Sequence, residues 1–291
     1  MKKLELSVII PTRNRLDATI RTLLSLTFQT LDQDLFEVIV VDDGSIRDTF
    51  HILKKLTHRL GFRIIKNKDQ GSAACARNVG WRKSDGNIVV FLDCDMIADP
   101  KLIEMHLDYH GKPNSDRDVV LGYRFLTVES VEYPSFKNLN EIQDWAFSIQ
   151  LLPDEREKFW RSQSKVYYKQ KADWGCLYSH NISLRKSLIE QVGGFDDNFG
   201  GCGGEDVELG YRLFKISSNF IIGRKAIGYH QYHPRSPERW KSNFSNIEKI
   251  AIKHPELSWF KNKVLSEWRV ANNTDHESQT IKTRQIRDLL Q

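Results

Sequence analysis

The segment Ile88-Val89-Val90-Phe91-Leu92-Asp93-Cys94-Asp95 indicates most clearly how this chain folds. Five consecutive apolar residues are typical of a strand that is buried on both faces of a sheet. Two carboxylates follow one residue apart, and alternate side chains of extended backbone point the same way. Asp93 and Asp95 can therefore face one oxygen-binding divalent cation, Mg²⁺ or Mn²⁺, which leaves positions for substrate phosphates. An isolated Asp-x-Asp is equally compatible with a solvated turn, so the neighbouring segments decide between the two interpretations.

The same pattern occurs twice upstream, where an apolar run ends in polar residues. Residues 6–11 lead into Thr12-Arg13-Asn14-Arg15, and residues 36–41 lead into Asp42-Asp43-Gly44-Ser45. The spacers predict helices over 16–26 and 49–60 and a third strand over 62–65. Strands that alternate with helices predict right-handed βαβ units, and hence an α/β fold with a Rossmann-like, mostly parallel central sheet flanked by helices. Ligands of such sheets bind outside the carboxyl ends of the strands, so the three polar strand ends are expected on one rim.

Composition narrows the class of protein. The chain has 291 residues and a formal net charge of +5, a mild excess that favours anionic ligands such as nucleotides and does not favour a nucleic-acid-binding protein. Its apolar runs are too short for a membrane-spanning helix, and residues 1–5 lead straight into a strand without a signal-peptide hydrophobic region, so a cytoplasmic location is expected. The cysteines form no Cys-x-x-Cys pair and are expected to be reduced and mostly structural: Cys75, Cys94, Cys176 and Cys202.

Four ordered motifs extend the pattern to a known family. Residues 8–14, 40–45, 76–80 and 91–95 resemble the successive signatures of the family 2 nucleotide-sugar glycosyltransferases. The resemblance implies the GT-A fold, in which a nucleotide-binding α/β half is joined to an acceptor-binding half. On that basis the expected division is a nucleotide-sugar-binding half over 1–121, an acceptor-binding and catalytic half over 122–260, and a C-terminal helical extension over 261–291.

The resemblance also implies where the donor binds. Thr12 and Asp43 would contact the uracil and ribose end of a UDP-sugar, and Arg77 the base or the phosphates. Asp93 would contact the ribose, and Asp95 the metal that bridges the diphosphate. These roles agree with side-chain chemistry, because a carboxylate can accept the uracil imide N–H and a guanidinium can hold a phosphate oxygen. The complete set implied for donor binding is Pro11, Thr12, Arg15, Asp43, Arg77, Asp93 and Glu205.

A second signature lies in the other half of the chain. The glycine-dense segment 200–204 leads into Glu205-Asp206 at the predicted start of a helix. It resembles the Glu-Asp motif of galactosyltransferase-type and chondroitin-polymerase-type enzymes, in which the loop closes over the donor sugar and the Asp acts as the base. The alternative is that Asp206 only caps the helix, since N-terminal turns favour Asp. Cys202 stands where those enzymes usually have Trp, which leaves the identity of the donor sugar open.

His230 is the candidate for the remaining metal ligand. A His after the Glu-Asp motif resembles the third ligand of related GT-A enzymes, and neutral imidazole is a common metal donor. The alternative is a structural hydrogen-bonding residue. His233 follows three residues later and is not assigned as a ligand, because only one position matches the family.

The segment 122–171 matches no motif and is expected to determine acceptor specificity. Trp145 and Trp160 lie within it and could stack on a sugar or peptide acceptor. Packing of an amphipathic helix against the core is the more common role for any single aromatic residue.

The sequence therefore predicts a metal-dependent, inverting glycosyltransferase of hexosyltransferase type. It would use Mn²⁺ or Mg²⁺ and transfer a sugar from a UDP-sugar to a saccharide, peptide or small-molecule acceptor, with Asp206 as catalytic base and Asp95 and His230 as metal ligands. One alternative is a nucleotidyltransferase acting on sugar phosphates, although no Gly-rich, Lys-containing triphosphate loop follows the first strand. Another is a non-catalytic nucleotide-sugar binding module, in which loss of Asp206 or of the metal ligands would be expected.

Overall fold

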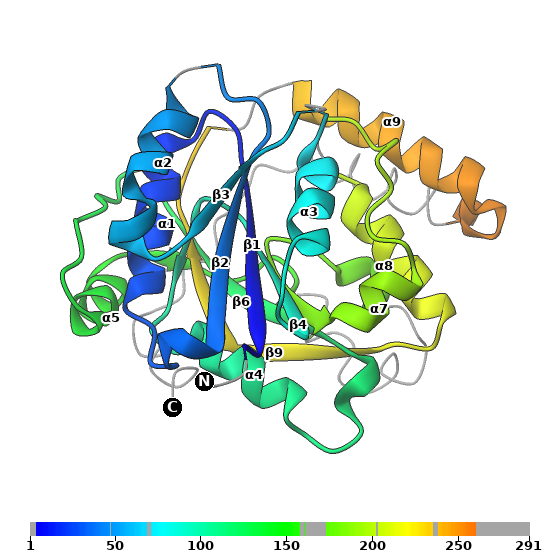
Figure 1. Cartoon of the computed structure of the whole chain (residues 1–291). Helices are drawn as coiled ribbons and strands as arrows, with labels where there is room; N and C mark the ends of the chain where they lie inside the picture. Colours follow the sequence, from blue (N-terminus) through cyan, green and yellow to red (C-terminus); the bar gives the residue numbers. More distant parts are fainter. Residues whose placement is uncertain are drawn as a thin grey trace.

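A computed structural model describes residues 4–46, 48–68, 71–157, 160, 173–201, 203–234 and 238–259. One curled sheet forms its centre, with helices on both sides (Figure 1). The strand order is β3-β2-β1-β4-β8-β6-β9-β5, with β7 paired to β6. The strands are β1 (Leu6–Thr12), β2 (Phe36–Asp42), β3 (Arg63–Lys66), β4 (Ile88–Leu92), β5 (Met96–Ala98), β6 (Asp118–Thr127), β7 (Leu151–Leu152), β8 (Asn181–Arg185) and β9 (Asn219–His230).

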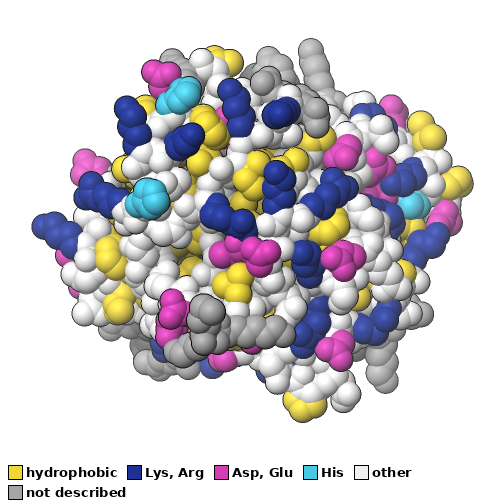
Figure 2. All heavy atoms as spheres, viewed as in Figure 1, with side chains coloured by type: hydrophobic (Ala, Val, Ile, Leu, Met, Phe, Trp, Pro, Cys, Tyr) yellow, Lys and Arg dark blue, Asp and Glu magenta, His cyan; other side chains and the backbone are white. Residues whose placement is uncertain are grey.

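The helices cover both faces of this sheet. They are α1 (Leu16–Thr27), α2 (Thr49–Leu60), α3 (Ala73–Arg82), α4 (Leu102–His110), α5 (Leu139–Ser148), α7 (Lys186–Gln191), α8 (Glu205–Lys215) and α9 (Glu238–Lys253). Short 3₁₀ helices are η1 (Gln33–Leu35), η2 (Ser115–Arg117), η3 (Asp173–Cys176) and η4 (Pro255–Leu257). No helix among the residues that the structure describes is long and apolar enough to cross a membrane. Figure 2 shows Lys and Arg side chains dispersed among acidic ones on the face seen in Figure 1.

The first part of the sheet is parallel, as predicted. β1 pairs in parallel with β2 and with β4, and β2 pairs in parallel with β3. Alternate residues of β1 pack into separate cores, because side chains alternate across a strand. Leu6 and Val8 join the core under α1, α2 and α4, whereas Ile9 joins the core under α3, α7 and α8. The fully apolar strands of the sequence are explained by this burial on both faces.

The second part of the sheet is mixed. β8 is antiparallel to both β4 and β6, β9 is parallel to β6, and β5 is antiparallel to β9. The sheet is therefore continuous between the two halves expected from the sequence, and the expected division at 121/122 falls inside β6. That division stays a prediction, and the expected extension over 261–291 lies outside the described residues.

A buried polar network connects α4 to β8, the strand that joins the two parts of the sheet. His106 Nδ1 and His110 Nε2 are each hydrogen-bonded to Ser183 Oγ at 2.8 Å, and His106 Nε2 to Asn181 Oδ1 at 2.8 Å. Asn181 in turn donates to the carbonyl oxygens of Tyr123 and Ala226 at 3.1 and 2.9 Å. Burial lowers the pKa of His106 to about 4 and, together with the neighbouring His106, the pKa of His110 to about 3. Both imidazoles are therefore neutral in the folded protein.

Of the two roles considered for Trp145 and Trp160, acceptor contact and core packing, the structure supports core packing. Both rings belong to the core, with 7% and 3% of their surface exposed. Trp145 packs edge-on against Tyr229, and its Nε1 donates to the carbonyl oxygen of Glu132 at 2.9 Å. The commoner alternative, core packing, therefore applies to both rings.

Candidate functional site

A cavity of about 1220 Å³ opens beyond the carboxyl ends of β1, β2 and β4. Its position agrees with the rule that ligands of open α/β sheets bind at that edge. The cavity brings together every site residue predicted from the sequence: Pro11, Thr12, Arg15, Asp43, Arg77, Asp93, Asp95, Glu205, Asp206 and His230. The polar strand ends therefore share one rim, as expected.

Asp43 is held at the end of the cavity next to β2. Its Oδ1 accepts hydrogen bonds from Asn67 Nδ2 at 2.7 Å and from the Gly71 amide at 3.3 Å. Arg13 Nη1 lies 3.9 Å from Asp43 Oδ2. The backbone amide of Asp43 also donates to the Thr12 carbonyl oxygen at 2.9 Å, which ties the ends of β1 and β2 together. A buried carboxylate with these fixed partners is a rigid acceptor for a ligand N–H or hydroxyl.

Arg77 connects the two sides of the cavity. This buried guanidinium on α3 donates to Asp93 Oδ1 at 2.9 Å and to Glu205 Oε1 at 3.3 Å. It also lies over the ring of Phe195, 5.5 Å from its centroid. Charge-assisted hydrogen bonds of this kind fix carboxylate positions strongly. Arg77 therefore holds the end of β4 and the start of α8 in a defined relation, which the sequence did not predict.

The glycine loop before α8 requires left-handed backbone. Gly201, Gly203 and Gly204 have φ of +75°, +84° and +91°, a region that favours glycine. Asn246 on α9 fixes this loop, because its Nδ2 donates to the Gly203 carbonyl oxygen at 2.7 Å and to that of Gly200 at 3.0 Å. A Cβ on Gly204 would lie 2.9 Å from Asn246 Cβ, so the close approach depends on glycine. Cys202 lies outside the described residues.

Asp206 lies in the first turn of α8 and does not cap it. Gly204 occupies the N-cap position, without a side-chain cap. Asp206 Oδ1 accepts from the Val207 amide at 2.8 Å, and Oδ2 from the Ser179 amide at 3.4 Å. Burial, and then the negative charge of Glu205, raise the pKa of Asp206 to about 7, although Arg77 opposes the shift. A carboxylate with that pKa is suited to take up a proton near neutral pH.

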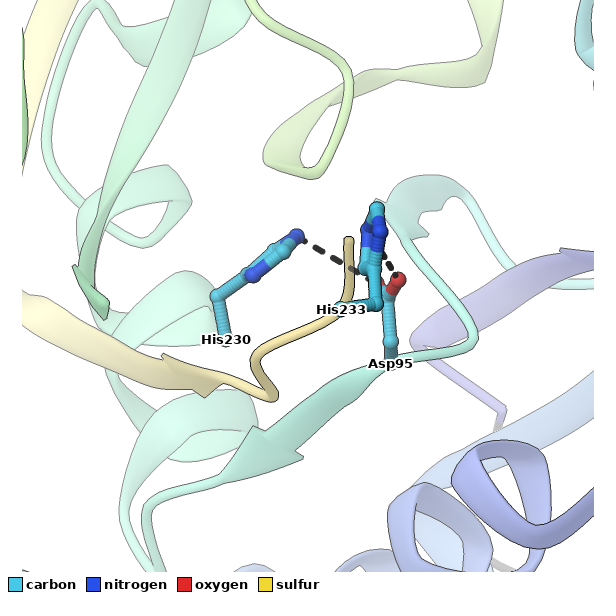
Figure 3. Close-up of side chains that lie close together, drawn as sticks. All are labelled: Asp95, His230 and His233. Carbon is cyan, nitrogen blue, oxygen red and sulfur yellow. Dashed lines mark ion pairs between the residues drawn. The ribbon is translucent and has the colours of Figure 1, made fainter. Parts of the chain in front are cut away.

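Asp95, His230 and His233 form a second cluster, drawn in Figure 3. His230 Nε2 lies 3.6 Å from Asp95 Oδ1, and His233 Nε2 lies 3.3 Å from Asp95 Oδ2. The ligand atoms of all three residues lie within 4.8 Å of one another. β5 and β9 hold them together, since Met96 pairs with His230 and the Gln231 amide donates to the Asp95 carbonyl oxygen at 2.8 Å.

The chemistry of this cluster fits a divalent cation. Asp95 Oδ1 is buried without a hydrogen-bond partner among the described residues. Burial alone would raise the pKa of Asp95, but the hydrogen bond from His233 and the charge of His230 outweigh it and lower the pKa to about 2. Burial lowers the pKa of His230, so its imidazole carries a charge only at lower pH, where it acts on Asp95, and is neutral near pH 7. An ionised carboxylate beside a neutral imidazole is a suitable donor set for a metal. His233, which the sequence left unassigned, belongs to this cluster.

Further lining residues were not predicted from the sequence. They include Arg124, Tyr178, His180 and Trp259. His180 comes directly before β8 and Arg124 lies within β6, so long-range strand pairing brings both to the cavity. No spacing in the sequence relates them to the strand-end motifs.

Comparison with known sequences identifies relatives over most of the chain. The profile of the family described as Glycosyl transferase family 2 matches residues 7–193. Validoxylamine A glucosyltransferase of Streptomyces hygroscopicus subsp. jinggangensis (strain 5008) is 32% identical over 266 residues, covering 87% of this chain and 61% of that protein. Chondroitin synthase of Pasteurella multocida (strain Pm70) is 32% identical over 251 residues, covering 80% of this chain and 25% of that protein. The chain therefore spans less than two thirds of the length of either relative.

Solved structures share the fold. S. aureus TarS 1-349 in complex with UDP aligns with a TM-score of 0.60 and 22% identity, over 86% of this chain and 65% of that chain. The mannosyltransferase PcManGT from Pyrobaculum calidifontis in complex with GDP-Man and Mn²⁺ aligns with a TM-score of 0.58 and 16% identity, over 87% and 65% of the respective chains. These alignments confirm the fold expected from the sequence.

Proposed function

Because the chain belongs to glycosyl transferase family 2 and has the GT-A fold, we propose that it transfers a sugar from a UDP-sugar to an acceptor. The acceptor group is a hydroxyl, an amine or a thiol, and the transfer inverts the configuration at the anomeric carbon. The relative TarS has been solved with UDP and with UDP-GlcNAc, which supports a uridine nucleotide as the carrier. The acceptor is a saccharide, a peptide or a small molecule.

One observation carries the proposal. The same cavity is lined by Asp206, a carboxylate whose pKa is raised to about 7, by the strand-end carboxylates and by the Asp95 cluster. A single displacement needs both kinds of group, a base for the acceptor and a site for the diphosphate. A module that only binds nucleotide-sugars would not need a carboxylate whose pKa is matched to proton transfer.

The donor would lie along the rim from β2 to β4. Asp43 would accept the uracil N–H or a ribose hydroxyl, beside Pro11 and Thr12. Asp93 would contact the ribose. Arg15 would bind a phosphate oxygen, since it lines the cavity and its positive charge acts on Asp95. Arg77 differs from its expected role, because two of its donors already hold Asp93 and Glu205. We assign it to positioning those carboxylates, and Glu205 to the hydroxyls of the donor sugar.

Asp95, His230 and His233 would hold Mn²⁺ or Mg²⁺. Two imidazoles in the donor set favour Mn²⁺, because Mg²⁺ prefers oxygen ligands. A bound cation supplies charge neutralisation for the departing diphosphate. The complex of PcManGT with GDP-Man and Mn²⁺ supports this choice.

The catalytic step proposed for Asp206 is proton removal. Its carboxylate takes the proton of the acceptor nucleophile while the new bond to the anomeric carbon forms and the bond from that carbon to the diphosphate breaks. The Ser179 and Val207 amides hold the carboxylate during this step. The charge of Glu205 raises the proton affinity of Asp206, so deprotonation of the acceptor is more favourable.

A hydrolysis screen tests the proposal. The full chain is incubated with Mn²⁺ and with UDP-glucose, UDP-galactose, UDP-N-acetylglucosamine or UDP-xylose, and free UDP is measured. We expect release from at least one of these donors, lost in Asp95→Ala and on addition of a chelator. No release from any donor, together with no binding of UDP in calorimetry, would contradict the proposed function.

A further inference from the structure

His180 is a buried residue whose two ring nitrogens have no hydrogen-bond partner in the part of the chain that the structure describes. Only 4% of its surface is exposed, yet it lines the cavity. Neither Nδ1 nor Nε2 has a hydrogen-bond partner among the described residues. Buried polar groups nearly always have a hydrogen-bond partner, because leaving one without a partner is destabilising. By contrast, His106 is equally buried and has partners on both ring nitrogens.

The position of His180 is fixed on both sides. Its carbonyl oxygen accepts from the Asp93 amide at 3.0 Å, at the point where β4 and β8 separate. The preceding residue, Ser179, donates its amide to Asp206. His180 therefore lies between the strand end assigned to the donor and the carboxylate assigned as base. In a single displacement the transferred sugar occupies that interval, because the base and the leaving phosphate lie on opposite sides of the anomeric carbon.

The surroundings keep the imidazole neutral. Burial, and then the positive charge of Arg124, lower the pKa of His180 well below its ordinary value. A neutral imidazole offers one donor and one acceptor. A sugar hydroxyl is the complementary group, since it accepts at its oxygen and donates its hydrogen. Arg124 also lines this cavity, and its Nε, buried without a hydrogen-bond partner among the described residues, supplies a second donor.

We propose that His180 is a specificity-determining residue that hydrogen-bonds a hydroxyl of the transferred sugar. The inference rests on the proposed function and extends it to recognition of the donor. A site built to hydrogen-bond a hydroxyl discriminates strongly against a sugar that lacks it or presents it with the wrong configuration. His180 thus helps to select among UDP-sugars, whereas UDP itself does not reach it.

The test compares wild type with His180→Phe, His180→Ala, His180→Asn and His180→Gln. Calorimetry with Mn²⁺ measures affinity for UDP and for UDP-glucose, UDP-galactose, UDP-N-acetylglucosamine and UDP-xylose. We expect the Phe and Ala variants to bind UDP as wild type does and to bind the preferred UDP-sugar about tenfold more weakly, the effect of one lost hydrogen bond. The ratio between the affinities for the preferred UDP-sugar and for the other three should decrease by the same factor. Asn or Gln, which retain a donor and an acceptor, should recover part of the loss. His51→Phe, on the exposed face of α2, is the control.

Several results would overturn the inference. They are unchanged sugar affinity and preference in the folded Phe or Ala variant, an equal loss of affinity for UDP, a change only in transfer to an added acceptor, or the same loss in Asn and Gln as in Ala. If wild type neither binds UDP nor hydrolyses any donor, the proposed function fails and the inference with it. If wild type is active and all His180 variants match it, only the inference fails.

Discussion

Asn246 donates its side-chain amide to the carbonyl oxygen of Gly203 at 2.7 Å, and so links α9 to the loop that precedes Glu205 and Asp206. The same amide holds Gly200. Because the loop residues adopt left-handed backbone and Gly204 is the N-cap of α8, this link helps to set where the first turn of α8 begins. A residue that does not itself line the cavity therefore helps to position the proposed base.

Asn246→Ala should lower turnover about tenfold or more while UDP affinity stays near that of wild type. The loop carbonyls lose their donor, and small displacements of a catalytic group are costly. Steady-state kinetics and UDP calorimetry check this. Lys249→Ala is the matched control, since Lys249 also lies on α9 but donates to the Asn198 carbonyl oxygen at 2.9 Å and lies over the Phe199 ring. An equal effect of both substitutions, or none from Asn246→Ala, would contradict the link.

The acidic limb of the pH profile should report Asp206. With a pKa of about 7, kcat/KM is expected to rise with pH up to about neutrality and then level off, because the base must be deprotonated. Glu205→Gln removes a negative charge that raises this pKa, so the limb should move to lower pH even though donor affinity falls. The dependence of kcat/KM on pH in wild type, in Glu205→Gln and in the exposed control Glu190→Gln tests the direction of this shift. A limb that does not move in Glu205→Gln would show that another group titrates.

His233 should matter to metal binding as much as His230. Its Nε2 is the nearer of the two to an Asp95 oxygen, at 3.3 Å against 3.6 Å. The gain in UDP affinity that Mn²⁺ confers should disappear in Asp95→Ala and fall tenfold or more in each His→Ala variant. Calorimetry with and without chelator measures it, with His58→Ala as control. A normal gain in His233→Ala would restrict the site to Asp95 and His230, as predicted from the sequence.

The free energy of unfolding should decrease as pH falls, because His106 and His110 are buried in a hydrogen-bonded network. Their pKa values are about 4 and about 3 in the folded protein, against an ordinary value of 6.5. The unfolded chain therefore binds more protons between about pH 6.5 and 4, so the free energy of unfolding decreases as pH falls, by up to ~1.4 kcal/mol per pH unit for each His. Urea unfolding of wild type and of His106→Gln/His110→Gln checks this. Equal slopes in both proteins would exclude the network as the cause.

The predicted parts of the fold are those that local sequence determines. The runs that end at Thr12, Asp42 and Leu92 are apolar because both faces of β1, β2 and β4 are buried, and parallel strands bring their carboxyl ends to one edge. Local periodicity also predicted α1 and α2 nearly to their ends. The resemblance to known motifs then predicted that Glu205 and Asp206 belong to the same site as the end of β4, which spacing alone would not predict.

The unpredicted parts depend on pairing between distant segments. β6, β8 and β9 come together across more than a hundred residues of sequence, so the place of Arg124 and His180 in the cavity has no local signature. Trp145 was equally ambiguous, because an amphipathic helix shows which face is apolar but not whether that face meets the core or a ligand. His233 lies three residues after His230, a spacing that in extended backbone does not by itself bring both rings to one ion. The turn after β9 does so here.

The turnover of Asp206→Asn with the preferred UDP-sugar tests most directly whether Asp206 is the catalytic base. Donor affinity is measured in the same experiment, and NMR gives the anomeric configuration of the product. Asn keeps the size and much of the hydrogen bonding of Asp but cannot accept the proton. We expect donor affinity close to that of wild type, turnover lower by roughly a hundredfold or more, and a product of the wild-type enzyme with inverted configuration. Near-normal turnover of Asp206→Asn, or a product that retains the configuration of the donor, would contradict this expectation.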